Sequence, residues 1–207
     1  MRRVFFDLDG TLLDSRRRLF SLFTDLVPLH GLSFDEYWSL KRAQCDHENI
    51  LINRMGYTIK QFERFNSNWM HLIETPKYLQ FDVPFQGITE MFDGLRSMKY
   101  LLYIATSRQS RSGTFSQLKA FGWQNQFDDV FITENLKTKG LLISSYFKGL
   151  AHDDIMIGDT GADIECGNYL NIITIAVLSG FRNKQALEKY DPDHIFDNVT
   201  DIDFTKV

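Results

Sequence analysis

Apolar and polar positions recur along this chain with two different spacings. A short apolar run, Val4–Phe6, predicts a buried strand near the start. From residue 15 to residue 81 the apolar positions return every three or four residues, as they do on one face of a helix. Beyond residue 82, short apolar runs alternate with helical patterns, which is typical of a parallel sheet covered by helices on both faces.

Three amphipathic helices are expected between residues 15 and 81. The first carries its apolar residues on one face. The second and third begin at capping boxes, in which Ser33 precedes Glu36 and Thr58 precedes Gln61. The first face comprises Leu19, Leu22, Phe23 and Leu26, and the third helix has a stripe of Ile59, Phe62, Phe65, Trp69, Leu72 and Ile73. We interpret that stripe as core, not as a binding surface.

The remaining chain is predicted to consist of helix–strand units that follow a connector at residues 82–87. The expected helices are Ile88–Met98, Thr114–Phe121, Gly140–Leu150, Asp163–Tyr169 and Lys184–Tyr190. The expected strands are Leu101–Ala105, Asp129–Ile132, Ile155–Ile157, Ile172–Val177 and His194–Phe196. Because a helical block separates the first strand from the others, we predict an α/β fold. Its Rossmann-like three-layer core (residues 1–14 and 82–207) has a parallel sheet, and an all-helical cap (15–81) is inserted after the first strand.

Composition and charge limit the functions that a protein of this fold could have. The chain has 207 residues, of which 43% are hydrophobic, and this suffices for one core with an insertion. Its net charge of −4 argues against a nucleic-acid-binding protein, which usually has a basic balance. The only basic run, Arg16–Arg18, is interpreted as a solvent-exposed helix face.

Three absences in the sequence point to a cytoplasmic protein. Cys45 and Cys166 lie far apart, without metal-ligand spacing or a disulfide framework. No apolar stretch has the length of a membrane span. Met1 is followed almost at once by the first strand, without the apolar region of a signal peptide. We therefore expect a soluble monomer or homodimer with no membrane partner.

Two acidic residues stand at the end of the first strand. Asp7 and Asp9 follow the apolar run, and Gly10 lets the chain turn sharply. Ligands of open parallel sheets bind at the carboxyl ends of the strands. Two carboxylates there repel each other unless a positive group neutralises them, so a divalent cation and phosphate chemistry would justify the arrangement. Taken alone, the run could equally be an ordinary turn rich in Asp and Gly.

Further polar residues follow other strands of the predicted sheet. Thr106, Ser107 and Arg108 come after one strand, and the run from Gly158 to Asp163 comes after another. Lys137 and Lys139 precede the helix between them. Each has an ordinary explanation, such as a helix N-cap made by Thr160 with Asp163. Their joint occurrence at one sheet edge is much harder to obtain by chance.

These motifs resemble those of the haloacid dehalogenase-like hydrolase superfamily. The run from Asp7 to Thr11 matches its first motif and Thr106 its second, and the similarity extends from residue 2 to about residue 200, including the ending from Ala176 to Arg182. Lys139 matches the third motif, although Lys137 is two residues away, and Asp159 with Asp163 matches the fourth. The chain has Ser107 where the family often has Asn, and Gly140 where it often has Pro.

The resemblance implies a role for each residue in phosphoryl transfer. Asp7 would attack phosphorus and form an aspartyl-phosphate, while Asp9 would act as acid towards the leaving alcohol and then as base towards water. Thr106, Ser107 and Lys139 would bind the oxygens of the transferred phosphoryl group. A dehalogenase expels halide and needs no acid at Asp9, so Asp9 favours a phosphatase.

The resemblance also implies a magnesium ion as cofactor. Mg²⁺ prefers hard oxygen ligands. The side chains of Asp7 and Asp159 and the backbone carbonyl of Asp9 would supply them. Asp163 would support this shell, directly or through water or Lys139.

The helical insertion resembles the small all-helical cap of phosphoglycolate phosphatases, phosphosugar phosphatases and β-phosphoglucomutases. Such a cap closes over the site, excludes water and admits only small phosphorylated metabolites. Candidate substrate contacts are Arg108 in the core and Lys41, Arg42, His47 and Arg54 in the cap, each of which could equally be an exposed charge. His47, between Asp46 and Glu48, is interpreted as part of a polar cluster at a helix end.

The leading functional hypothesis is a magnesium-dependent phosphatase that acts on a small phosphomonoester. A phosphosugar mutase, which would pass the phosphoryl group to a sugar instead of to water, stays open as an alternative. A non-catalytic binding protein of the same fold would have lost a core acid or the lysine. The chain retains all of them.

Overall fold

Six parallel strands form one sheet in the computed structural model, which describes residues 1–29 and 31–207. Their order in the sheet is β5-β4-β1-β6-β7-β8, and every neighbouring pair is parallel. The strands are β1 (Arg3–Phe6), β4 (Leu101–Thr106), β5 (Asp129–Ile132), β6 (Ile155–Gly158), β7 (Ile173–Val177) and β8 (His194–Phe196). Each of the six strands expected from the sequence is present to within one residue at either end.

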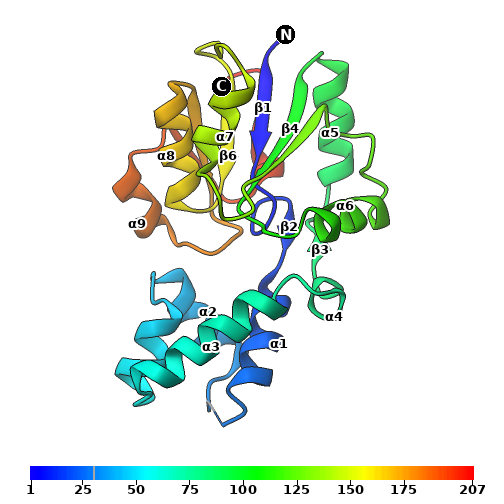
Figure 1. Ribbon diagram of the computed structural model, residues 1–207. Coiled ribbons are helices and arrows are strands. Elements are labelled where there is room, and N and C mark those ends of the chain that lie inside the picture. Colours follow the sequence, from blue (N-terminus) through cyan, green and yellow to red (C-terminus); the bar gives the residue numbers. More distant parts are fainter. Residues whose placement is uncertain (30) are drawn as a thin grey trace.

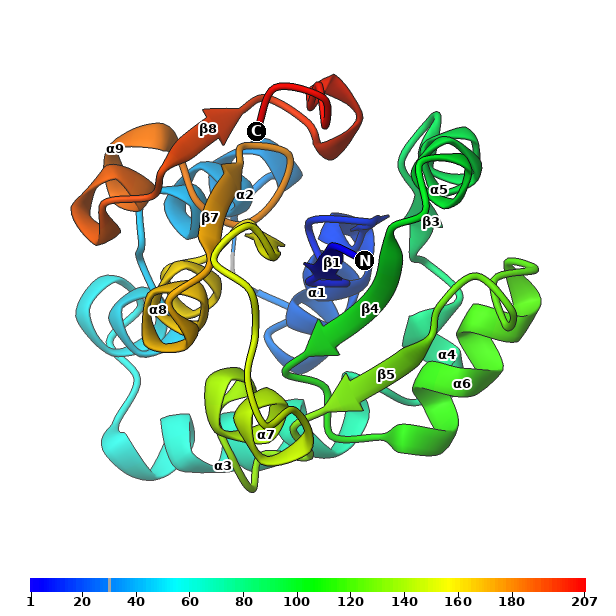
Figure 2. The ribbon, with the colours of Figure 1, turned by 90° about the horizontal axis from the view of Figure 1, so that it is seen from above.

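Helices cover both faces of this sheet, as the α/β prediction requires. They are α5 (Ile88–Ser97), α6 (Arg111–Ala120), α7 (Lys139–Tyr146), α8 (Gly161–Leu170) and α9 (Lys184–Leu187), followed by short 3₁₀ helices at Glu188–Tyr190 and Val199–Asp201. Figure 2 shows α5 and α6 on one side of the strands and α7 and α8 on the other. Because side chains alternate along a strand, Phe6 packs towards α5, whereas Phe5 packs towards α7 and α8. The strand β1 is therefore buried on both faces.

Several helix boundaries differ from those expected, and two of the differences have a clear physical cause. The helix predicted over Gly140–Leu150 ends at Tyr146, because Phe147 is extended and its ring packs edge-on against Phe5 with ring centroids 5.8 Å apart. The helix predicted to begin at Thr114 begins at Arg111, because the Ser110 side chain accepts a hydrogen bond from the Gly113 amide at 3.0 Å. Tertiary packing in the first case and a cap in the second set these ends.

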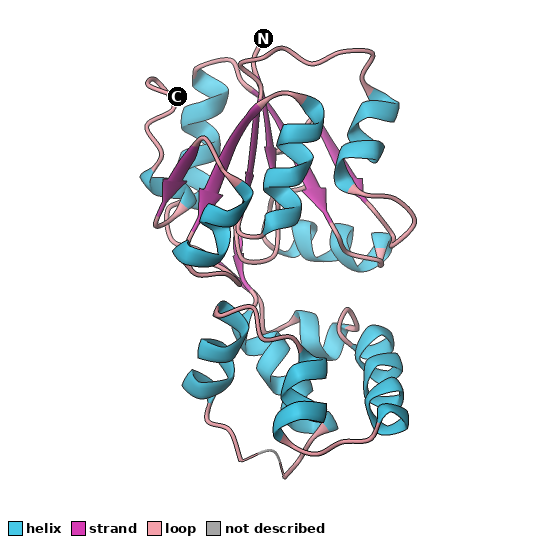
Figure 3. Ribbon diagram, turned by 90° about the vertical axis from the view of Figure 1, so that its left-hand side faces the viewer, coloured by secondary structure: helices cyan, strands magenta, loops and turns pink. Residues whose placement is uncertain are grey.

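Residues 15–29 and 31–81 form a separate group of helices beyond the carboxyl edge of the sheet (Figures 1 and 3). Both expected capping boxes are formed, at Ser33 and at Thr58. The elements are α1 (Arg16–Leu26), α2 (Phe34–Arg42), a π-helix (Asn49–Arg54), α3 (Ile59–Leu72) and α4 (Pro76–Leu79). They enclose an apolar cluster of their own, which includes Phe23, Tyr37 and Phe65.

The chain passes between the sheet and this helical group twice, and the two crossings pair with each other. Leu13–Asp14 (β2) and Val83–Pro84 (β3) form a two-stranded antiparallel ladder. Strands of two residues are too short to show periodicity, so the sequence pattern did not indicate them. The ladder and the separate apolar cluster support the proposal that residues 15–81 are an inserted cap.

His47 lies among aromatic rings of the helical group and is not part of a polar cluster at a helix end, as the sequence had suggested. Its ring centroid is 4.3 Å from that of Trp69 and 5.6 Å from that of Phe23, and its Nε2 is 2.8 Å from the Tyr37 hydroxyl. Burial, reinforced by the nearby charge of Lys41, lowers the pKa of His47 well below its usual value. His47 therefore packs as a neutral residue.

Because His47 is buried as a neutral residue, we expect the protein to lose stability at low pH. His47→Gln should make this loss smaller. The unfolded chain takes up a proton near pH 6.5 and the folded chain does not, so stability is full above that pH and falls as pH drops below it. The loss attributable to His47 should be at most about 1.4 kcal/mol for each pH unit below 6.5. Denaturant unfolding at pH 7.5 and pH 5.5 measures it. Equal losses in wild type and variant would contradict the assignment.

Cys45 and Cys166 are both free thiols. In the described part of the chain, every helix is too short or too polar to traverse a bilayer.

Candidate active site

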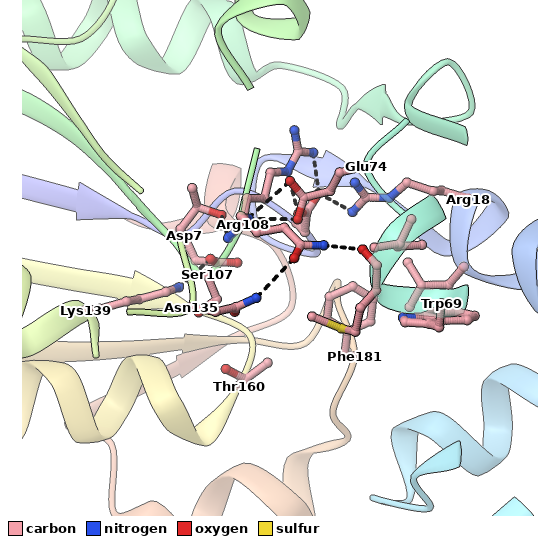
Figure 4. Close-up of a pocket in the computed structure, with 16 residues that line it drawn as sticks. Asp7, Arg18, Trp69, Glu74, Ser107, Arg108, Asn135, Lys139, Thr160 and Phe181 are labelled. Atoms are coloured by element: carbon pink, nitrogen blue, oxygen red, sulfur yellow. Dashed lines mark hydrogen bonds and ion pairs between the residues drawn. The ribbon is translucent and has the colours of Figure 1, made fainter. Parts of the chain in front are cut away.

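Five polar side chains from separate parts of the chain meet at the carboxyl edge of the sheet, and Figure 4 shows two of them, Asp7 and Lys139. Asp7 follows β1, Thr106 ends β4 and Asp159 follows β6, and these three strands are neighbours in the sheet. Lys139 is the first residue of α7, and Asp163 lies in the first turn of α8. All five side chains are buried. The parallel register therefore brings together residues that are up to 156 positions apart in the sequence (163 − 7).

Three of these residues form a compact carboxylate cluster. One oxygen from each of Asp7, Asp159 and Asp163 lies within 4.8 Å of the others. Lys139 Nζ donates hydrogen bonds to Asp7 and, at 2.5 Å, to Asp163 Oδ1. Three carboxylates and one ammonium leave a formal charge of −2 if all are ionised. Burial raises the pKa of Asp7 and of Asp159, and repulsion among the carboxylates adds to the increase. The buried oxygen donors and the excess of negative charge fit a hard divalent cation such as Mg²⁺.

The two lysines between which the sequence left a choice lie in different surroundings. Lys139 contacts the carboxylate cluster, while Lys137 is exposed to solvent. The sequence allowed Asp163 to be either a helix-capping residue or part of the site, and its two oxygens make both kinds of contact. Its Oδ2 accepts hydrogen bonds from the Thr160 amide and hydroxyl at 3.1 and 2.7 Å, and its Oδ1 faces Lys139. The N-cap of α8 therefore also belongs to the site.

Asp159 is held in place by close backbone approach. The Phe181 amide donates to its Oδ2 at 2.5 Å. Gly10 has a φ of +94°, and a Cβ built on Gly10 or Gly180 would lie 2.5 or 2.0 Å from Asp159 Oδ2. Only glycine fits at these two positions without displacing the carboxylate.

The Asp9 side chain is not part of the carboxylate cluster and is bound by two arginines. Arg108 donates to it through Nε at 2.8 Å and NH2 at 2.6 Å, Arg18 NH2 lies 2.7 Å away, and the Ser15 hydroxyl donates at 2.7 Å. Burial alone would raise the pKa of Asp9, but Arg108 and then Arg18 hold it well below the usual range. In this conformation Asp9 is ionised.

Both arginines also contact a second buried carboxylate. Arg18 Nε lies 3.2 Å from Asp82 Oδ1, and Arg108 NH2 lies 3.0 Å from Asp82 Oδ2. Gln117 Nε2 donates to Asp82 at 3.0 Å. We call Asp9, Arg18, Asp82 and Arg108 the arginine–aspartate cluster. Its two positive and two negative charges balance.

Arg18 was expected on a solvent-exposed helix face, and this prediction was wrong. Only 3% of Arg18 is exposed. A signal was available, because Arg18 lies four residues before Leu22, on the face of α1 that carries the apolar residues. The sequence indicates Asp82 only as part of a connector. Its role is not visible there, because its partners Arg18 and Arg108 are 64 and 26 residues away (82 − 18 and 108 − 82).

A cavity of about 270 Å³ opens above the carboxylate cluster. Thr106, Ser107, Lys139 and Arg108 line it, as expected. The predicted cap contacts do not. Lys41, Arg42, His47 and Arg54 are absent from its wall, and Arg42 instead donates to the Leu178 carbonyl at 3.1 Å. The helical side of the cavity is lined by Arg18, Leu19, Trp69, Met70, Ile73 and Glu74.

The apolar stripe of α3 is therefore only partly core. Phe65 is buried as expected, but Trp69 and Ile73 reach the cavity, and Ile59 is 68% exposed. The helical pattern identifies which residues share a face. It does not distinguish a face that meets other helices from one that meets a cavity.

The position of Asp7, directly after the first strand of the parallel sheet, agrees with the comparison with known families. The model of the haloacid dehalogenase-like hydrolase family matches residues 4–177. The chain therefore belongs to this family, as the resemblance had indicated.

Relatives align along nearly the whole chain. It is 24% identical to pyrophosphatase PpaX of Halalkalibacterium halodurans, covering 96% of this chain and 94% of the relative. It is 26% identical to phosphoglycolate phosphatase of Synechococcus elongatus, covering 98% and 95%. The structure of a haloacid dehalogenase-like hydrolase from Streptococcus pneumoniae superposes with a TM-score of 0.78 at 23% identity, covering 97% and 96%. The last similarity concerns the fold.

Proposed function

We propose that this protein is a magnesium-dependent phosphatase that hydrolyses a small phosphomonoester through an aspartyl-phosphate on Asp7. The observation that carries the proposal is the position of Asp7, hydrogen-bonded by Lys139 within a buried carboxylate cluster at the floor of a small cavity. Relatives named as phosphatases and pyrophosphatases support the same class of reaction.

In the first half of the reaction, a carboxylate oxygen of Asp7 attacks phosphorus and the bond from phosphorus to the leaving alcohol breaks. Carboxylates suit this role, because the loose transition state of phosphoryl transfer demands little from the nucleophile. Thr106 and Ser107, at the end of β4, would bind phosphoryl oxygens. Lys139 would offset the charge that accumulates beside Asp7.

The metal would be held by Asp7 and Asp159, with the Asp9 carbonyl as a further ligand and Asp163 in support. When bound, it would supply positive charge that draws the anionic phosphate towards an anionic nucleophile. Asp163 and Lys139 position each other through their 2.5 Å contact.

Asp9 would serve as the acid and base. Its ionised carboxylate suits the second half of the reaction, in which it would accept a proton from the water that attacks the aspartyl-phosphate. In the first half it would need to carry a proton for the leaving alcohol. That protonation requires its contacts with Arg18 and Arg108 to weaken, because both favour the ionised form.

Metal removal tests this proposal. We expect the release of inorganic phosphate from phenyl phosphate to cease after treatment with a chelator and to return when Mg²⁺ is added. Asp159→Asn should raise the Mg²⁺ concentration needed for half-maximal activity by at least about tenfold, because it removes one anionic ligand. Phosphate release that is unaffected by the chelator would contradict the proposal.

A matched control is available at the surface. Asp35 is exposed in the first turn of α2, in the helical group, and is not part of the carboxylate cluster. Asp35→Asn makes the same chemical change as Asp159→Asn. It should leave the Mg²⁺ dependence unaltered.

A further inference from the structure

The wall of the cavity that faces the leaving group is largely apolar. The phosphoryl end of a substrate is directed to the core side by Asp7 and Lys139, so its alcohol must extend towards the opposite wall. Figure 4 shows Trp69 and Phe181 on the side of the cavity away from Lys139. Its apolar residues are Leu19, Trp69, Met70 and Ile73 from the helical group together with Phe181 from the core, and Arg18 and Glu74 of the helical group also line the cavity.

The cations that line the cavity are already paired. Among the described lining residues they are Arg18, Arg108 and Lys139. Lys139 faces Asp7 and Asp163, while the two arginines are balanced by the acids of the arginine–aspartate cluster. A carboxylate or second phosphate on the leaving group would therefore find no uncompensated positive charge among these residues.

Glu74 adds a fixed negative charge to the same wall. Its carboxylate accepts hydrogen bonds from the backbone amides of Gln109 at 2.9 Å and Ser110 at 2.7 Å, just before α6 begins. These contacts anchor the carboxylate at the boundary between the helical group and the core. It opposes the approach of an anionic leaving group.

We propose that the substrate is the monophosphate ester of a compact, uncharged, apolar alcohol, an aryl ester being the best match to the wall formed by Trp69 and Phe181. The inference rests on the proposed phosphatase function. It separates this protein from relatives named for phosphoglycolate and pyrophosphate, whose leaving groups are anionic.

A pair of esters that differ only in charge tests the inference. The substrates 4-carbamoylphenyl phosphate and 4-carboxyphenyl phosphate have nearly the same shape, and the second carries an additional negative charge. We expect kcat/KM with Mg²⁺ to be at least about tenfold higher for the carbamoyl ester, with the difference mainly in KM. Equal values, or a preference for the carboxylate, would overturn the inference. So would a preference for 2-phosphoglycolate or pyrophosphate over phenyl phosphate.

Substitutions at Met70 provide the matched variants. Met70 lies on the wall and is 39% exposed, so a polar replacement can be accommodated. Met70→Lys adds a positive charge to the wall and should shift the ratio of kcat/KM by about tenfold towards the carboxylate ester. Met70→Gln, similar in length but neutral, should leave the ratio unchanged. Identical ratios in the two variants would contradict the charge argument.

The outcomes separate this inference from the function on which it rests. If no phosphate is released from any of these esters in the presence of Mg²⁺, the proposed phosphatase function fails, and the substrate class fails with it. If phosphate is released but anionic leaving groups are preferred, the phosphatase function stands and only the substrate class is wrong.

Discussion

Asp7→Asn is expected to lower kcat for phosphate release by about 10⁴-fold or more, because an amide cannot form the acyl phosphate. The variant should stay folded. Asparagine has nearly the same shape, and the substitution removes one of three buried carboxylates that repel one another. Lys139 retains its 2.5 Å contact with Asp163.

Two measurements together decide this prediction. The rate of phosphate release reports the loss of the nucleophile, and the thermal midpoint in metal-free buffer reports the change in repulsion, which should leave the variant at least as stable as wild type. Asp35→Asn serves again as the control and should alter neither quantity. Turnover that survives in Asp7→Asn would exclude the proposed nucleophile.

Arg18→Met is expected to destabilise the protein by about 3–5 kcal/mol, because it leaves Asp9 and Asp82 with Arg108 as their only arginine partner. Both carboxylates are largely shielded from water, so neither can be stabilised by solvent in its place. The free energy of unfolding in denaturant measures the effect. The adjacent Arg17 is exposed, and Arg17→Met should change that free energy by less than about 0.5 kcal/mol.

A double variant shows whether the loss arises from unbalanced charge. Arg18→Met combined with Asp82→Asn leaves one arginine and one carboxylate, Arg108 and Asp9, which remain paired. It should be more stable than Arg18→Met alone, although two groups have been changed instead of one. If the two losses simply add, the cost comes from packing and not from charge.

The sheet and most of the site could be predicted from the sequence because their signals are local. Each strand is a short apolar run, and in a parallel sheet the residue after such a run lies at the same edge as its counterparts. Asp7, Thr106 and Asp159, which were expected at one edge, follow or end the neighbouring strands β1, β4 and β6. The capping boxes at Ser33 and Thr58 were equally local and were formed as expected.

The features that were missed depend on partners far along the chain. Three basic residues in a row predict a solvated face unless a buried acid is known to meet one of them, and Asp82 is 64 positions beyond Arg18 (82 − 18). For the basic residues of the helical group, the sequence indicates charge but not which residues face the cavity. The wall that actually faces the cavity is made by Leu19, Trp69 and Met70, whose chemistry gave no sign of a functional role.

The glycines around Asp159 restrict which parts of the pocket can diverge. A side chain added at Gly10 or Gly180 would collide with the Asp159 carboxylate, so the floor tolerates almost no variation. The opposite wall has no such constraint, since Met70 is partly exposed and borders open space. A lineage carrying this scaffold can therefore acquire new substrates by changing a few residues of α1 and α3 while its reaction chemistry stays the same.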